Sequence, residues 1–184
     1  MNLNRLLRMT ETTIEWFANI GAFLLIPLIL TMVTEVVSRY VFNSPTLWAY
    51  EMAYFLTGSF FLLGLAHTLQ IGAHVKVDMM TDILPDRANQ IIYIVGYIFA
   101  GSFTIWSFFG LTESFLETLH TRETTGESAW NPVLWPFRAM AALGFLLFSV
   151  QILVELYQHI ADFIKGRPFN RKSGVLGESE SGEI

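Results

Sequence analysis

Residues 91–111 read IIYIVGYIFAGSFTIWSFFGL, a run of apolar and small residues without a charged side chain. A helix needs ~20 mainly apolar residues to cross the ~30 Å hydrocarbon core of a bilayer, and this run has that length. Over the whole chain 53% of the residues are hydrophobic and 15% are charged, which points to hydrocarbon as the main solvent. The run therefore predicts a membrane-spanning helix, which we expect to continue as a helix toward Leu119 outside the bilayer.

Three further stretches, residues 16–37, 47–69 and 133–157, are also mainly apolar and long enough to cross the hydrocarbon core. An N-terminal signal peptide is the alternative reading of the first, because Arg5 and Arg8 precede it. The apolar run is longer than a signal peptide requires, and no Ala-x-Ala site closes it. The sequence therefore predicts an all-α membrane protein with four transmembrane helices.

The four helices are expected to form one membrane domain over residues 1–165. Residues 166–184 are rich in Gly, Ser and Glu and contain few apolar residues. Such a segment cannot bury enough surface to offset the entropy of an ordered chain. We expect it to be a disordered cytoplasmic tail.

The distribution of basic residues predicts the orientation, because Lys and Arg concentrate in short cytoplasmic flanks. The N-terminus, the second loop and the C-terminal tail carry eight of them, against two in the first and third loops. The first set is Arg5, Arg8, Lys76, Arg87, Lys165, Arg167, Arg171 and Lys172, and the second is Arg39 and Arg122. Both termini are therefore expected in the cytoplasm (N-in/C-in).

The second loop, Gly72 to Arg87, contains apolar residues that fit one face of a short helix before Pro85 ends it. They are Val75, Met79, Met80, Ile83 and Leu84. We expect a short amphipathic helix at the cytoplasmic interface, between the second and third transmembrane helices.

Composition excludes several classes of chemistry. The chain has no cysteine, so disulfides, thiolate nucleophiles, iron–sulfur clusters and zinc sites containing Cys are excluded. The net charge of −5 implies no nucleic-acid-binding surface. His67 and His159 lie near the same membrane boundary, so bis-histidine haem ligation is a minor alternative. Glu113 and Glu117 are interpreted as a solvated helix face, and Glu155 and Asp162 as charges that reach water.

Among the charged residues within the predicted spans, two are candidates for a function: Glu51 near the start of the second span and Arg138 near the start of the fourth. Charges at such positions are costly and usually find partners. Three interpretations stay open: a direct ion pair between the two, a contact of either residue with another subunit, or separate snorkelling to water.

The first outer loop reads RYVFNSPTLWAYE at residues 39–51, and the second loop reads HVKVD at 74–78 and LP at 84–85. Together with NPVLWP at 131–136 and the four-span layout, these strings resemble the small membrane subunit of tripartite ATP-independent periplasmic (TRAP) transporters, the DctQ-like family. The resemblance covers roughly residues 30–150. Arg138 is not expected from the family pattern, so of these residues it is the one whose role can least be carried over from the family.

The resemblance implies a non-catalytic subunit, without cofactor, metal or substrate site, in a bacterial inner membrane. Its expected partners are a large membrane subunit (DctM-like) that transports an organic anion with sodium, a periplasmic substrate-binding protein (DctP-like), and lipids. Residues expected at the partner or lipid interface, or in assembly, are Arg39, Asn43, Pro45, Trp48, Glu51, His74, Asp78 and Arg138.

Physical roles can be assigned to several of these residues. Pro45 fixes its own φ and biases Ser44 toward extended backbone, which suits a tight loop. Asp78 is placed to cap the interfacial helix, and His74 to face anionic headgroups. Ordinary anchoring at the membrane boundary is the alternative for every one of them. The alternative functions are a membrane anchor of a redox enzyme complex and a freestanding small carrier, which would be expected to show more polar breaks at mid-bilayer.

Overall fold

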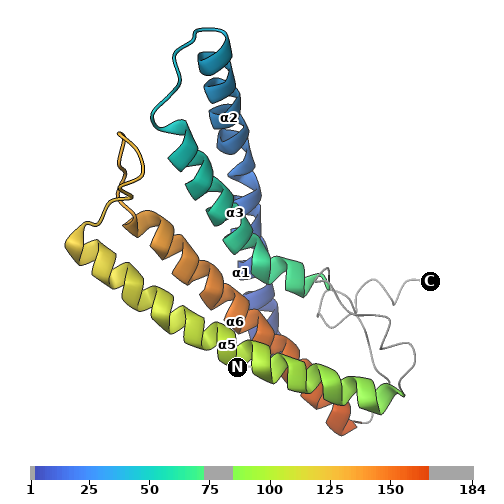
Figure 1. The fold of residues 1–184 in the computed structure, drawn as a ribbon. Coiled ribbons are helices and arrows are strands. Elements are labelled where there is room, and N and C mark those ends of the chain that lie inside the picture. The colour runs from blue at the N-terminus through green and yellow to red at the C-terminus, as the bar shows by residue number, and fades with distance from the viewer. Residues whose placement is uncertain (1–2, 73–84, 166–184) are drawn as a thin grey trace.

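The computed structural model is all-helical over the residues it describes, 3–72 and 85–165 (Figure 1). Four of its helical segments are long and apolar enough to cross a membrane, which confirms the predicted fold class at this level. The helices, labelled as in Figure 1, are α1 (Leu3–Phe23), α2 (Leu25–Tyr40), α3 (Ala49–Gln70), α5 (Asp86–Thr121) and α6 (Trp135–Lys165).

Helices α1 and α2 together form the first candidate span, Leu7–Tyr40, with a break at Leu24. Pro27 causes the break, because it has no N–H to donate to the carbonyl three or four residues back and its ring crowds that turn. The backbone N–H of Leu24 is instead shared between the carbonyls of Ile20 and Gly21, at 3.2 and 2.9 Å. The predicted first span is therefore one helical segment with a one-residue break.

The helices extend beyond the apolar runs that predicted them. Helix α5 has 36 residues, or ~54 Å at ~1.5 Å per residue, although the hydrocarbon core is only ~30 Å thick. Its continuation past the apolar run, expected as far as Leu119, reaches Thr121. Hydropathy marks the part of a helix that suits lipid, whereas local hydrogen bonding decides where the helix ends.

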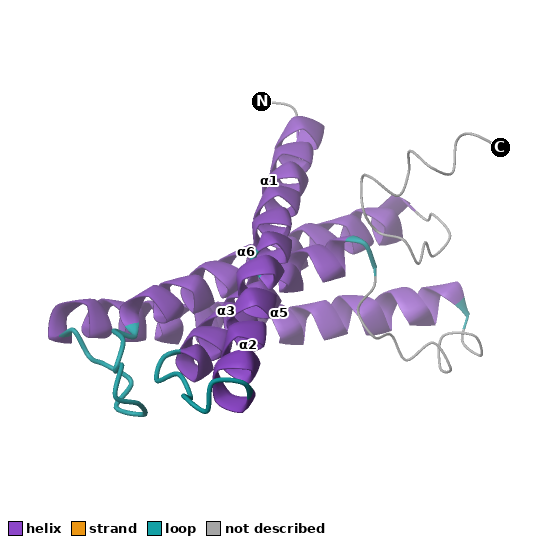
Figure 2. Cartoon of the chain, turned by 90° about the horizontal axis from the view of Figure 1, so that it is seen from above, coloured by secondary structure: helices purple, strands orange, loops and turns teal. Residues whose placement is uncertain are grey.

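Helices α3 and α6 form the centre of the bundle. Helices α1 and α2 pack on α3, and α5 packs along α6. Figure 1 shows α5 and α6 side by side along their length, and Figure 2 shows α1 crossing them at a steep angle. The apolar core lies where α1, α3 and α6 meet, and its buried residues are Ile14, Leu63, Ala66 and Leu147.

Close approach of α3 and α6 depends on two glycines. A Cβ atom at Gly144 would lie 2.7 Å from the backbone oxygen of Leu62, and one at Gly58 would lie 2.4 Å from the ring of Phe137. Small residues let membrane helices pack closely, where apolar burial alone gives no preference over lipid. Gly144 therefore sets how closely the backbones of α3 and α6 approach, and Gly58 leaves room for the ring of Phe137.

The connections 41–48 and 122–134 lie at the same end of the molecule, which we call the loop end (Figure 1). Helix α1 begins and α6 ends at the opposite end, the terminal end. The predicted interfacial helix falls on residues 73–84, which lie outside the described residues.

Candidate functional site

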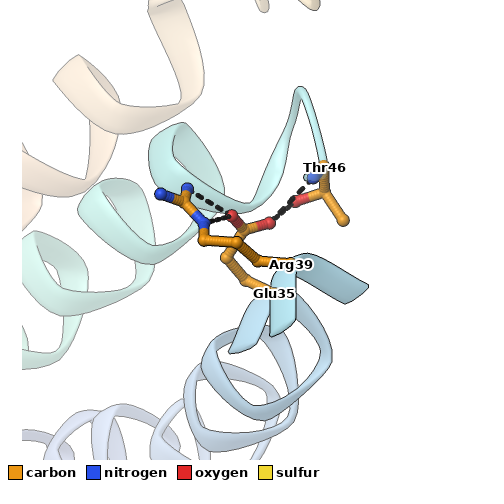
Figure 3. A network of polar contacts seen from close by, with 3 residues as sticks. All are labelled: Glu35, Arg39 and Thr46. Carbon is orange, nitrogen blue, oxygen red and sulfur yellow. Dashed lines mark hydrogen bonds and ion pairs between the residues drawn. The ribbon is translucent and has the colours of Figure 1, made fainter. Parts of the chain in front are cut away.

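A polar network at the loop end fixes the connection between α2 and α3 (Figure 3). Arg39 donates to Oε1 of Glu35 from Nε at 2.9 Å and from Nη2 at 2.5 Å. The other carboxylate oxygen of Glu35 accepts the backbone N–H of Thr46 at 3.0 Å, and also the Thr46 hydroxyl. Glu35 thus ties the last turn of α2 to the end of the connection, and both of its oxygens are occupied.

Glu35 and Thr46 were not among the predicted site residues. The spacing of Glu35 and Arg39 by four residues on one helix was the available signal, because residues so spaced face each other. The contact to Thr46 joins residues 11 apart in the sequence, across the end of α2 and the irregular chain that follows it, and no local pattern predicts it.

Asn43 ends helix α2 by adopting a positive φ of 52°. Among residues other than glycine, Asn tolerates the left-handed region comparatively well, because its short polar side chain can bond locally. The reversal brings the N–H of Ser44 to the carbonyl of Ser38, at 2.9 Å. Asn43 and Pro45 are exposed, and their position in this turn gives them a role in the shape of the backbone.

Trp48 stands directly before helix α3, and its carbonyl accepts the N–H of Met52 at 3.0 Å. Its side chain is exposed and makes no cap hydrogen bond. An indole at a helix boundary in a membrane protein suits the interface between headgroups and hydrocarbon.

Glu51, in the first turn of α3, is almost fully buried, with 1% of its surface exposed. Its Oε2 accepts the hydroxyl of Thr125, at 2.9 Å, from the connection between α5 and α6. No hydrogen-bond partner of Oε1 lies among the residues that the structure describes. A carboxylate in the first turn of a helix is favoured by the helix dipole.

The connection 122–134 is a small hairpin that presents Thr125 to Glu51. Thr124 and Val133 form an antiparallel bridge, and the N–H of Thr125 donates to the carbonyl of Pro132 at 3.1 Å. The side-chain oxygen of Asn131 accepts the N–H of Gly126 at 2.7 Å, which closes the tip. The sequence pattern gave no indication of this hairpin.

Arg138, in the first turn of α6, also contacts this hairpin. Its Nη2 lies 3.1 Å from a carboxylate oxygen of Glu123. Its Nη1 donates to the carbonyl of Ser114 at 3.3 Å and to the hydroxyl of Thr118, both on α5. Arg138 therefore joins the start of α6 to the end of α5.

The direct ion pair between Glu51 and Arg138 is wrong for this structure. The guanidinium pairs with Glu123, and Glu51 contacts Thr125, two residues further along the same hairpin. Glu51 and Arg138 both lie at the loop end, as their similar positions in the predicted spans suggested. Each contacts a different residue of the hairpin. Within the described residues, the two side chains thus contact the same hairpin at Thr125 and Glu123 and do not pair with each other.

Charge-reversal variants distinguish the observed pair of Arg138 with Glu123 from a pair of Arg138 with Glu51. Arg138→Glu should lower the free energy of unfolding by about 1–2 kcal/mol through lost hydrogen bonds and like-charge repulsion, and adding Glu123→Arg should restore part of that loss. Adding Glu51→Arg should restore nothing. Unfolding in mixed micelles of increasing SDS content measures all three variants, and recovery only with Glu51→Arg would contradict the observed pairing.

At the terminal end a second group of polar side chains is buried between the helices. Its members come from α1, α3, α5 and α6, and they are Glu11, Gln70, Asn89, Gln90, Gln151, Glu155 and His159. The expectation that Glu155 reaches water is wrong, because only 2% of its surface is exposed and Gln151 donates to it at 3.1 Å. Contacts with neighbouring helices, which a single helix pattern does not show, bury it.

The two histidines of the haem hypothesis have different surroundings. His159 is buried and stacks on Tyr97, with ring centroids 5.3 Å apart. His67 is half-buried, and its Nδ1 lies 3.4 Å from the side-chain oxygen of Gln70. In the described ranges, no three His, Cys, Asp or Glu side chains gather in a way that could hold a metal ion.

His74 and Asp78 lie outside the described residues, so their expected roles stay predictions. Glu113 and Glu117 are exposed on α5, as expected for a solvated helix face. The structure thus brings three predicted residues, Arg39, Glu51 and Arg138, into polar contacts at the loop end. The contacts of Glu51 and Arg138 each join two elements of the chain, and Arg39 pairs within α2 with Glu35, which bonds Thr46 of the connection. This arrangement fixes shape.

Comparison with known proteins gives a match to one protein family. The family model described as tripartite ATP-independent periplasmic transporters, DctQ component, matches residues 28–162, which run from α2 into α6.

Two relatives have similar segments. The C4-dicarboxylate TRAP transporter small permease protein DctQ of Vibrio cholerae is 26% identical over 102 residues, which are 50% of this chain and 44% of that protein. The sialic acid TRAP transporter permease protein SiaT of Haemophilus influenzae is 29% identical over 76 residues, 41% of this chain and 12% of that protein. The chain thus spans less than half the length of either relative.

Proposed function

Because this chain belongs to the family of DctQ components of tripartite ATP-independent periplasmic transporters, we propose that it is the non-catalytic small permease subunit of such a transporter. In this role it supports a large membrane subunit, which takes up an organic anion with sodium. A periplasmic binding protein delivers the anion. The observation that carries the proposal is the match over residues 28–162, which covers most of the described helices.

The fold supports a role as a stationary partner. Large apolar side chains such as Phe99 and Trp106 of α5 are exposed along the candidate spans, and lipid or another subunit would cover them. A transport domain that moves across the membrane needs a part that stays in place, and these helices enlarge that part's contact with lipid. The sodium-coupling and substrate sites then belong to the large subunit.

The orientation follows the distribution of basic residues. With both termini in the cytoplasm, the loop end faces the periplasm, where the binding protein arrives. The membrane is then the bacterial inner membrane. His74 and Asp78 would lie at the cytoplasmic boundary, beside headgroups or a loop of the large subunit.

The loop end would serve assembly through its fixed shape. Glu51 and Arg138 hold the hairpin of residues 122–134. Asn43 and Glu35, which is paired with Arg39, hold the connection of residues 41–48. A preformed surface binds a partner with less loss of conformational entropy than a mobile one. Trp48 and Pro45 are exposed beside it and are placed to touch the large subunit or lipid.

The transported substrate is proposed only as a class. The two relatives are named for sialic acid and C4-dicarboxylates, which are both carboxylic acids. An organic anion is therefore the substrate class to test first. The family match does not favour the alternative of a redox-enzyme anchor.

Uptake in a strain lacking this chain tests the proposal. We expect labelled organic-acid uptake, driven by a sodium gradient, to fall to background without the chain and to return when the intact chain is supplied. The large subunit should copurify with it from membranes.

The matched control is Gly110→Ala, at an exposed position of α5 with open space around it, which should restore uptake fully. Full uptake by cells that lack the chain would contradict the proposal. A haem Soret band in the purified protein, with a soluble dehydrogenase as the copurifying partner, would instead support the redox anchor.

A further inference from the structure

A groove of about 540 Å³ runs between α2 and α3, next to the loop end. On α2 it is lined by Leu28 and Met32, and on α3 by Ala49, Ala53 and Thr57. The small side chains of α3, spaced by four residues, share one helix face and leave the space open. The volume lies within the ~300–1,000 Å³ range of sites that hold small molecules.

The length and polarity of the groove match one leaflet of a bilayer. From Leu28 to Arg39 the α2 wall covers ~17 Å, about half of the ~30 Å hydrocarbon thickness. The wall is apolar at Leu28 and Met32 and becomes polar at Glu35 and Arg39. A phospholipid has the same order, with an acyl chain toward mid-bilayer and a charged headgroup at the boundary.

The polar end offers unused donors to an anion. Glu35 is neutralised by Arg39 and Thr46, which occupy both of its oxygens. Only Nε and Nη2 of Arg39 contact Glu35, and within the described part of the chain its Nη1 has no partner. The Arg39 side chain is 57% exposed, so a phosphate can reach it. Exposed Tyr50 and Tyr54 also line the groove, and such rings favour the membrane boundary.

We propose that this groove binds one glycerophospholipid, with an acyl chain between α2 and α3 and its phosphodiester on the Arg39 guanidinium. The order of the lining favours a lipid over an apolar protein helix, because the apolar wall ends at an exposed guanidinium that an anionic headgroup can reach. The site is independent of the proposed transport role.

Native mass spectrometry of the full chain tests the site. The protein is taken from nanodiscs of phosphatidylethanolamine and phosphatidylglycerol into detergent, and retained phospholipid is counted per copy. The wild-type chain should keep one. Ala53→Leu fills the groove and should lower the retained fraction at least tenfold, and Arg39→Gln removes the phosphate donor and should lower it roughly tenfold.

Ala100→Leu is the matched control, because it adds the same side chain at an exposed position of α5. It should retain lipid like the wild-type chain. Ala53→Leu does not depend on the Glu35 contact, so it tests the groove even if Arg39→Gln disturbs the loop. Equal lipid retention in Ala53→Leu and the control would overturn the proposal. So would unchanged retention combined with loss of a copurifying large subunit, which would assign the groove to a protein segment.

Discussion

Gly144→Ala is expected to lower the free energy of unfolding by about 1–3 kcal/mol, although it adds only one methyl group. The new Cβ would lie 2.7 Å from the backbone oxygen of Leu62 and 2.9 Å from its Cβ. Neither atom belongs to the flexible end of a side chain, so α3 and α6 must move apart. The loss should appear as unfolding at a lower SDS fraction in mixed micelles.

Gly110→Ala is the control, because a Cβ at this position of α5 has nothing within 4 Å. Both variants gain the same helix propensity, about 1 kcal/mol in water, so their difference isolates the close contact. Gly110→Ala should be neutral or stabilising. If the two variants unfold at the same SDS fraction, the close approach of α3 and α6 does not contribute to stability.

Glu51→Ala is expected to cost about 1.5–3 kcal/mol, because it removes a buried acceptor and leaves the Thr125 hydroxyl with a longer contact, 3.4 Å, to the side-chain oxygen of Asn131. The loss should also loosen the hairpin of residues 122–134 relative to α3. Unfolding in SDS gives the stability. Faster hydrogen exchange at the backbone amides of Thr125 and Gly126 would report the loosening.

Glu51→Gln keeps an acceptor oxygen of nearly the same size and should retain most of the stability. Thr125→Val removes the donor, and in its background Glu51→Ala should cost clearly less than in the wild-type chain, as expected for coupled residues. Equal costs in both backgrounds would show that Glu51 acts through a different contact. Coupling of Glu51 to a large subunit would appear only when that subunit is present.

These contacts add a polar link between the two helical hairpins of the bundle, α2–α3 and α5–α6. The α2–α3 hairpin reaches residues 122–134 through Glu51, and the α5–α6 hairpin reaches them through Arg138. Away from this connection, the hairpins meet mainly where α3 packs on α6. A partner that binds the loop end would therefore contact a surface held by both hairpins.

The sequence predicts several residues of the candidate site but not the residues that they contact, and the reason is physical. Glu51 and Arg138 were found because charges within a membrane span need partners, and Arg39 was found through the family resemblance of the first outer loop. Thr125, the partner of Glu51, and Glu123, the partner of Arg138, are ordinary polar residues in a loop, where no periodicity marks a contact. The same holds for Thr46, which bonds Glu35, the partner of Arg39. The buried state of Glu155 was missed because a helix pattern shows one face at a time and does not show which neighbour covers it.

The sequence by itself determined the four spans and the family. An apolar run of sufficient length has one stable arrangement in lipid, a helix that bonds its own backbone, so composition alone decides it. Tertiary structure alone decided which charges meet and how closely α3 and α6 approach. It also decided that α2 and α3 leave a groove between them. These features depend on contacts between residues far apart in the chain. Local sequence patterns do not give the distances between such residues.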